Sequence, residues 1–120
     1  MMIKQIILVG LGGATGSIFR FLMSVFVNKY SFSVFPVATF SINIIGCFLI
    51  GLFAGLFPAN DDLRFLLIVG FCGGYTTFST FAAENLYLLQ NNQIPIAIVY
   101  TLLSVIVGII AVWLGMYISK

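Results

Sequence analysis

One stretch of the chain combines residues that could bind an ion through uncharged groups. The segment GFCGGYTTFSTFAAEN (Gly70–Asn85) holds three glycines, four serine or threonine hydroxyls and one glutamate between long apolar runs. The pair Gly73 and Gly74 weakens a helix, and Thr76 and Thr77 then compete for its backbone hydrogen bonds. We therefore expect a helix break here, with freed carbonyl oxygens of the kind that suit a hard cation. One break supplies too few ligands for a closed shell, whereas two chains meeting here could supply one.

Two phenylalanines follow the expected break. Phe78 and Phe81 are three residues apart and share a helix face, while Thr77, Thr80 and Glu84 fall on an adjoining face. A phenylalanine pair at this spacing is most often core packing, but a lipid-facing stripe would not need the interleaved hydroxyls. The edge of an aromatic ring carries partial positive charge. Such edges could face an anion without binding it as tightly as a lysine would.

Further polar side chains lie inside the other apolar runs, where they normally face a bundle interior or a water-filled cavity. Arg20 could reach the membrane interface, or it could line an aqueous mouth that attracts anions. Asn43 could bond a neighbouring helix, or it could present its amide donors to an ion. Tyr100, Thr101 and Ser104 lie within about one helical turn, and they could join helices or line a path.

The composition of the chain indicates the environment of these polar groups. The chain has 120 residues, of which 62% are hydrophobic and 7% are charged. A soluble domain of this size could not keep so much apolar surface dry, because a small globule leaves much of its surface exposed. A membrane-spanning helix needs about 20 apolar residues, so the chain has room for about four. We expect a single transmembrane domain over residues 1–120, with spans at about 6–27, 35–57, 63–89 and 94–119.

Charge and residue content exclude several classes of function. The net charge is only +2 and forms no basic stripe, so nucleic acid is not an expected partner. Histidine is absent, which removes the commonest general base and metal ligand. With no paired carboxylates at a common depth and no activated nucleophile, an enzyme is not expected. Cys47 and Cys72 lie inside apolar runs and are predicted to be free thiols.

The positive charges give little bias to the orientation in the membrane. The expected side with both termini carries Lys4, Arg64 and Lys120, whereas the opposite side carries Lys29. The positive-inside rule counts these residues, and the margin is slender. The chain could therefore insert both ways up and form an antiparallel homodimer, although a single weakly biased orientation is also open.

Small residues recur at helical spacing and predict close contacts between helices. They include Gly12 and Gly16 in the first expected span, Gly51 and Gly55 in the second, and Gly108, Ala111 and Gly115 in the fourth. We interpret these stripes as packing surfaces.

The sequence resembles the Fluc family of small bacterial fluoride channels over nearly its whole length. The likeness rests on GGATGSIFRF (Gly12–Phe21), NIIG (Asn43–Gly46) and above all GFCGGYTTFSTFAAE (Gly70–Glu84). It implies an all-α membrane protein with four transmembrane helices, a break in the third, and an antiparallel dual-topology homodimer. It also implies two pores per dimer in the bacterial inner membrane, passive export of fluoride and fluoride resistance.

The resemblance also implies roles for particular residues. The residues that match its fluoride pore are Asn43, Phe78, Phe81, Thr77, Ser79, Thr80, Tyr100 and Ser104. Arg20 matches an arginine near the vestibule. Gly73 and Thr76 match positions whose backbone carbonyls, from both subunits, hold a structural sodium ion at the dimer centre. Gly108 departs from the pattern, because relatives can carry a further hydroxyl there.

The chemistry of fluoride suits these residues. Fluoride is small, strongly hydrated and a strong hydrogen-bond acceptor, so its dehydration requires donors such as amides and hydroxyls. Conduction also requires binding weak enough for exit, which neutral donors and ring edges permit.

Two other functions remain open at this point. A small proton-coupled exporter of cationic drugs would need a membrane-embedded carboxylate, for which Glu84 is the candidate. A non-transporting assembly subunit would give no ion flux when purified alone.

Overall fold

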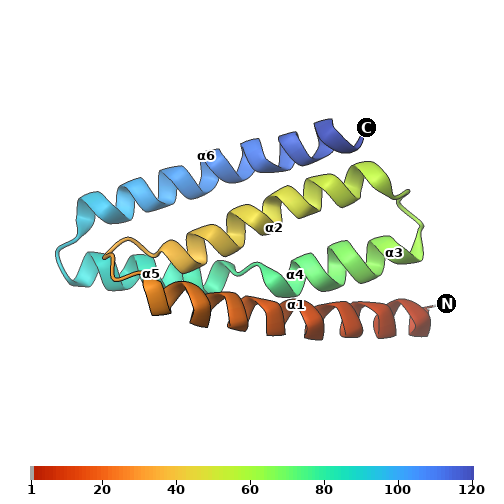
Figure 1. The fold of residues 1–120 in the computed structure, drawn as a ribbon, viewed down its shortest axis with the longest axis horizontal. Coiled ribbons are helices and arrows are strands. Elements are labelled where there is room, and N and C mark those ends of the chain that lie inside the picture. Colours follow the sequence, from red (N-terminus) through yellow and green to blue (C-terminus); the bar gives the residue numbers. More distant parts are fainter. Residues whose placement is uncertain (1) are drawn as a thin grey trace.

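The structure, a computed structural model, describes residues 2–120 and is built of helices, with no strand among these residues (Figure 1). The elements in chain order are α1 (Met2–Tyr30), α2 (Val37–Leu56), α3 (Asp62–Arg64), the π-helix η1 (Phe65–Cys72), α4 (Gly73–Tyr75), α5 (Phe78–Gln90) and α6 (Ile94–Ser119). Four stretches are long and apolar enough to cross a membrane: Met2–Tyr30, Val37–Leu56, Asp62–Gln90 and Ile94–Ser119. The prediction of an all-helical, multi-pass membrane protein with four spans is confirmed.

Local sequence signals mark the ends of these helices. The side chain of Asp61 accepts a hydrogen bond from a first-turn amide of α3, and the hydroxyl of Thr77 does the same for α5. Pro95 lies in the first turn of α6, where its missing N–H costs little. Asn92 has a φ of 60° and reverses the chain between α5 and α6, a conformation that asparagine tolerates better than most residues.

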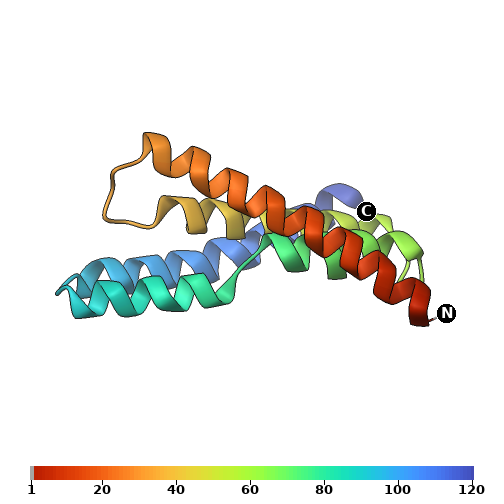
Figure 2. The ribbon, with the colours of Figure 1, turned by 90° about the horizontal axis from the view of Figure 1, so that it is seen from below.

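The third span is not one regular helix. It begins as α3, continues as the π-helix η1 and α4, and passes through two extended residues before α5 (Figure 2). These residues are Thr76, with φ −81° and ψ 158°, and Thr77, with φ −147° and ψ 120°. Gly73 keeps helical angles of −62° and −37°, so the extended backbone begins at Thr76 and not at the glycine pair.

The glycines act mainly through their size. A Cβ atom on Gly74 would lie 2.5 Å from the carbonyl oxygen of Gly13, and one on Gly12 would overlap the carbonyl oxygen of Leu66. These contacts bring α1 against η1 and α4. Gly51 and Gly115 allow the same close approach of α2 and α6, which confirms the predicted packing surfaces.

Both chain ends lie at the same end of the molecule as the connection from α2 to α3 (Figure 1). Lys4 pairs there with Asp62 at 2.6 Å, between two exposed side chains. Arg64 donates to the carbonyl of Phe57 at 3.0 Å, close to the C-terminal end of α2. Lys4 and Arg64, both counted above for the orientation in the membrane, thus interact with neighbouring groups.

A small core lies near the opposite end. Leu88, Ala97 and Tyr100 are buried together, and Phe35 and Phe81 are among the half-buried aromatic residues packed on them. Most other large apolar side chains are exposed, as expected for helices whose outer faces contact lipid. α1 diverges from α5 toward this end (Figure 2). The candidate site lies beside that divergence.

Candidate functional site

The extended backbone of the third span is held by an amide side chain from α2. The N–H of Thr77 donates to Oδ1 of Asn43 at 2.8 Å, and Nδ2 of Asn43 donates to the Thr77 carbonyl at 3.0 Å. An asparagine amide offers a donor and an acceptor, as a peptide group does. Asn43 therefore pairs with Thr77 much as a neighbouring strand would, and one Nδ2 hydrogen remains for another acceptor.

This pairing changes the hydrogen bonding of two carbonyls. In a continuous α-helix the Thr77 amide would donate to the carbonyl of Gly73, and the Thr80 amide to that of Thr76. Instead the Thr77 amide donates to Asn43, and the Thr80 amide donates to the Thr77 hydroxyl at 3.2 Å. The Gly73 and Thr76 carbonyls thus lose their α-helical donors. Oxygens of this kind suit a hard cation.

A positively charged side chain reaches the same region from α1. Nε of Arg20 donates to the carbonyl of Gly74 at 3.0 Å. Arg20 also lines a hollow of about 270 Å³, together with Thr39, Thr77 and Thr80. The guanidinium and the hydroxyls give this hollow a positive charge and hydrogen-bond donors, which favour an anion. The structure thus places Arg20 beside a polar hollow within the span.

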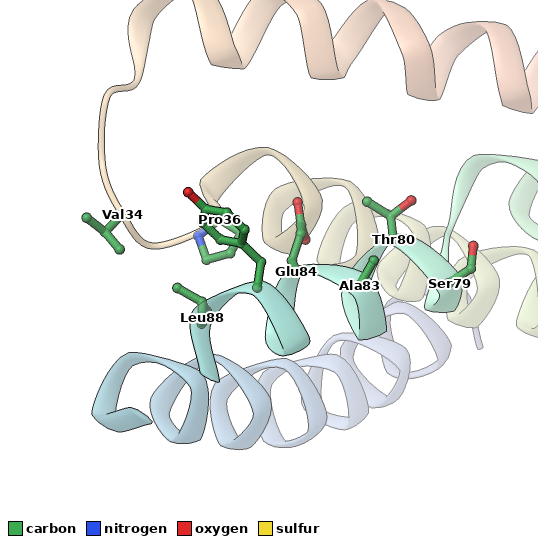
Figure 3. Close-up of a pocket in the computed structure, with 8 residues that line it drawn as sticks. Val34, Pro36, Ser79, Thr80, Ala83, Glu84 and Leu88 are labelled. Atoms are coloured by element: carbon green, nitrogen blue, oxygen red, sulfur yellow. The ribbon is translucent and has the colours of Figure 1, made fainter. Parts of the chain in front are cut away.

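The one carboxylate on α5 is bound by hydroxyls from two other helices. The Thr39 hydroxyl donates to Oε2 of Glu84 at 2.9 Å, and the Tyr100 hydroxyl donates to Oε1 at 2.8 Å. Glu84 also lines a second hollow, of about 530 Å³, beside Ser79 and Thr80 (Figure 3). In that view the side chains of Ser79, Thr80 and Glu84 leave α5 on the same side. Thr80 borders both this hollow and the one beside Arg20.

The two candidate phenylalanines lie side by side but in different surroundings. Their ring centroids are 5.8 Å apart with an interplanar angle of 42°. Phe81 is half-buried, and its ring centroid lies 4.9 Å from that of Tyr100. Phe78 is 78% exposed and borders a third hollow, of about 220 Å³, together with Asn43 and Thr77.

The remaining predicted site residues lie at different places. The Ser79 hydroxyl, in the first turn of α5, is 3.3 Å from that of Thr77, which caps the helix. The hydroxyl of Ser104 is buried and has no hydrogen-bond partner among residues 2–120. The hydroxyl of Tyr100, a residue predicted to line the fluoride pore, donates to Glu84 in this structure.

Reasoning from the sequence missed Thr39, which is buried and bonds Glu84. For Asn43 the structure shows the first of the two predicted options, a bond to a neighbouring segment of the bundle. A hydroxyl one turn from a buried amide was the available signal for Thr39.

These features define a small multi-pass membrane protein that holds polar, mostly uncharged groups at an extended segment inside its third span. No group of three or more His, Cys, Asp or Glu residues that could hold a metal occurs between residues 2 and 120. The chain belongs to the family described as CrcB-like protein, Camphor Resistance (CrcB), which matches residues 7–116.

Relatives match the chain over nearly its full length. A protein of Flavobacterium psychrophilum is 50% identical, with 98% of each chain covered. Proteins of Azobacteroides pseudotrichonymphae and Phocaeicola vulgatus are 41% and 42% identical, covering 99% and 98% of this chain and 98% and 99% of their own. All three carry the name fluoride-specific ion channel FluC. The resemblance to fluoride channels is confirmed.

Proposed function

We propose that this protein is a fluoride-selective channel that lets fluoride leave the cytoplasm passively, down its electrochemical gradient. The observation that carries the proposal is the near full-length relationship to proteins named as fluoride-specific ion channels, at up to 50% identity. We place the protein in the bacterial inner membrane, with lipid around its apolar faces. As a channel it would perform no covalent chemistry.

The polar groups around the extended segment support a path for a small anion. The Arg20 hollow would attract fluoride by charge, and the hydroxyls of Thr77, Ser79 and Thr80 could replace part of its hydration shell. The free Nδ2 hydrogen of Asn43 offers another donor next to Phe78. Because these donors are neutral, binding would stay weak enough for exit.

The exposure of the candidate site supports a homodimer. Phe78 is 78% exposed and the hollow that it shares with Asn43 opens outward, so a single copy leaves this part of the path unenclosed. We propose that a second, oppositely oriented copy closes it, which gives two pores per dimer. The slender bias of the lysines and arginines is compatible with insertion in both orientations.

The same assembly could hold a sodium ion at its centre. The carbonyls of Gly73 and Thr76 have lost their α-helical donors, so they suit the cation that the family resemblance implies. When bound, a sodium ion would stabilise the juncture of the two copies by neutralising carbonyl dipoles. Each chain would contribute these carbonyl oxygens, which the extended backbone leaves without helical hydrogen bonds and so available to the ion.

Anion efflux from liposomes tests the proposal. Purified protein is reconstituted into liposomes loaded with potassium fluoride or potassium chloride, and efflux is started with a potassium ionophore. We expect rapid loss of fluoride with chloride retained, and slower fluoride loss for Phe78→Ile and Phe81→Ile. Equal loss of both anions would refute selectivity. Transport that needs a proton gradient would indicate an exporter, and no flux would indicate a non-transporting subunit.

A further inference from the structure

We propose that Glu84 is a positioning residue for fluoride passage, because its carboxylate holds the Tyr100 hydroxyl and thereby fixes the ring of Phe81. This inference rests on the proposed fluoride function. It assigns a role to a charged group that the anion path itself does not require. It also assigns the pore role of Tyr100 to its ring, because its hydroxyl donates to Glu84.

A carboxylate within a membrane span is costly unless its oxygens are bonded. Glu84 meets this condition with one hydroxyl on each oxygen, from Thr39 on α2 at 2.9 Å and from Tyr100 on α6 at 2.8 Å. Hydrogen bonds to an ionised acceptor are roughly twice as strong as bonds between neutral groups. The carboxylate therefore ties three helices together at one point.

The Tyr100 ring transmits this constraint to Phe81. Tyr100 is fully buried, and its ring packs against those of Phe81, at 4.9 Å and 57°, and Phe35, at 5.3 Å and 74°. Its hydroxyl end is anchored on Glu84, which lies one turn after Phe81 on α5. The tyrosine ring thus blocks one side of the half-buried Phe81. Phe81 cannot turn toward α6 unless Tyr100 moves.

The carboxylate also organises charge around the path. Thr39 lines the hollow beside Arg20, Glu84 lines the larger hollow, and Thr80 borders both. The bond from Thr39 to Glu84 therefore lies between a positive hollow and a negative one. Arg20 and Glu84 thus place opposite charges on two neighbouring hollows, and the Thr39 bond holds the Glu84 carboxylate in place beside them.

A double-mutant cycle tests the positioning role. The variants are Glu84→Gln, Tyr100→Phe and the combination of the two, each measured for fluoride and chloride efflux from liposomes. We expect each single variant to slow fluoride efflux by about tenfold, as the loss of a charge-assisted hydrogen bond would. The double variant should be no slower than the slower single variant, because both changes act on the same bond: glutamine removes the charge of its acceptor, and phenylalanine removes its donor.

A neighbouring bond gives a matched control. The hydroxyl of Thr101 donates to Oδ1 of Asn85 at 3.2 Å, and it joins the same two helices one residue further along each. Thr101→Val should leave fluoride efflux within about twofold of the unchanged protein, since exposed polar contacts contribute little.

Anion selectivity separates positioning from a purely structural role. Loss of correctly folded protein would slow fluoride efflux without any gain in chloride efflux, whereas a displaced Phe81 should raise chloride efflux relative to fluoride. Tyr100→Phe removes only one oxygen, so it tests the inference even if Glu84→Gln does not fold. Unchanged efflux in Tyr100→Phe, or single effects that multiply in the double variant, would overturn it. Absence of fluoride flux in the unchanged protein would instead refute the proposed function, and this inference with it.

Discussion

The replacement Asn43→Leu removes the two hydrogen bonds by which Asn43 holds the extended backbone at Thr77. Leucine has the same branched arrangement of side-chain heavy atoms as asparagine, although it is bulkier, but it can neither accept from the Thr77 amide nor donate to the Thr77 carbonyl, which Asn43 engages at 2.8 and 3.0 Å. Each buried group left without a partner costs about 1–3 kcal/mol. Because the site is only partly buried, we expect the lower part of that range for each, about 2–3 kcal/mol together.

Two measurements check this value. The free energy of unfolding in detergent should fall by about 2–3 kcal/mol, and fluoride efflux from liposomes should fall by at least thirtyfold, since about 2 kcal/mol corresponds to roughly that factor. Asn28→Leu is the matched control, because Asn28 is exposed and makes one long hydrogen bond, of 3.4 Å, to Ser24. It should change neither quantity appreciably.

The result that would refute this reasoning is an Asn43→Leu protein with the stability and efflux rate of the Asn28→Leu control. Thr77 would then keep its extended conformation without Asn43. A loss of efflux with no loss of stability would mean that Asn43 acts only as a donor to the ion.

Three further changes test other parts of the structure. Gly115→Ala should destabilise the protein by about 1–3 kcal/mol in thermal or denaturant unfolding, because its Cβ would overlap the carbonyl oxygen of Phe48 where α2 and α6 meet; an unchanged midpoint would contradict that contact. Arg20→Gln should slow fluoride entry most at low ionic strength, because salt screens the attraction, so an equal effect at all salt concentrations would argue against charge attraction. Removal of sodium during purification should lower the unfolding temperature if the Gly73 and Thr76 carbonyls hold the ion, whereas equal unfolding temperatures with and without sodium would argue against the site.

The spans could be predicted from the sequence because the bilayer sets their length and apolar runs of that length are separated by Asn28–Lys29, Pro58–Asp62 and Gln90–Gln93. Contacts between glycines and backbones could also be predicted, because small residues recur at helical spacing. Neither inference requires knowledge of which helices are neighbours.

The details of the third span could not be predicted in this way. Helix propensity drew attention to Gly73 and Gly74, yet Gly73 remains helical and Gly74 packs against Gly13. A glycine pair has two uses, to end a helix or to allow close packing, and propensity does not separate them. The extended residues are Thr76 and Thr77, whose conformation depends on Asn43, 34 residues away in sequence from Thr77.

The hydrogen bonds from Thr39 and Tyr100 to Glu84 could not be predicted from the sequence for the same reason. Glu84 is 45 residues from Thr39 and 16 from Tyr100, and no periodicity relates the three. The sequence placed polar groups at comparable depths in separate spans. Which of them bond each other depends on helix rotation and register, which are set by packing.

Reversal potentials in a planar bilayer test the central claim most directly. With the purified protein in the bilayer, fluoride and chloride gradients are imposed in opposite directions and the voltage of zero current is measured. We predict a reversal potential that follows the fluoride gradient and does not change when the chloride gradient is altered. A reversal potential that follows chloride, or that responds equally to both anions, would contradict the account.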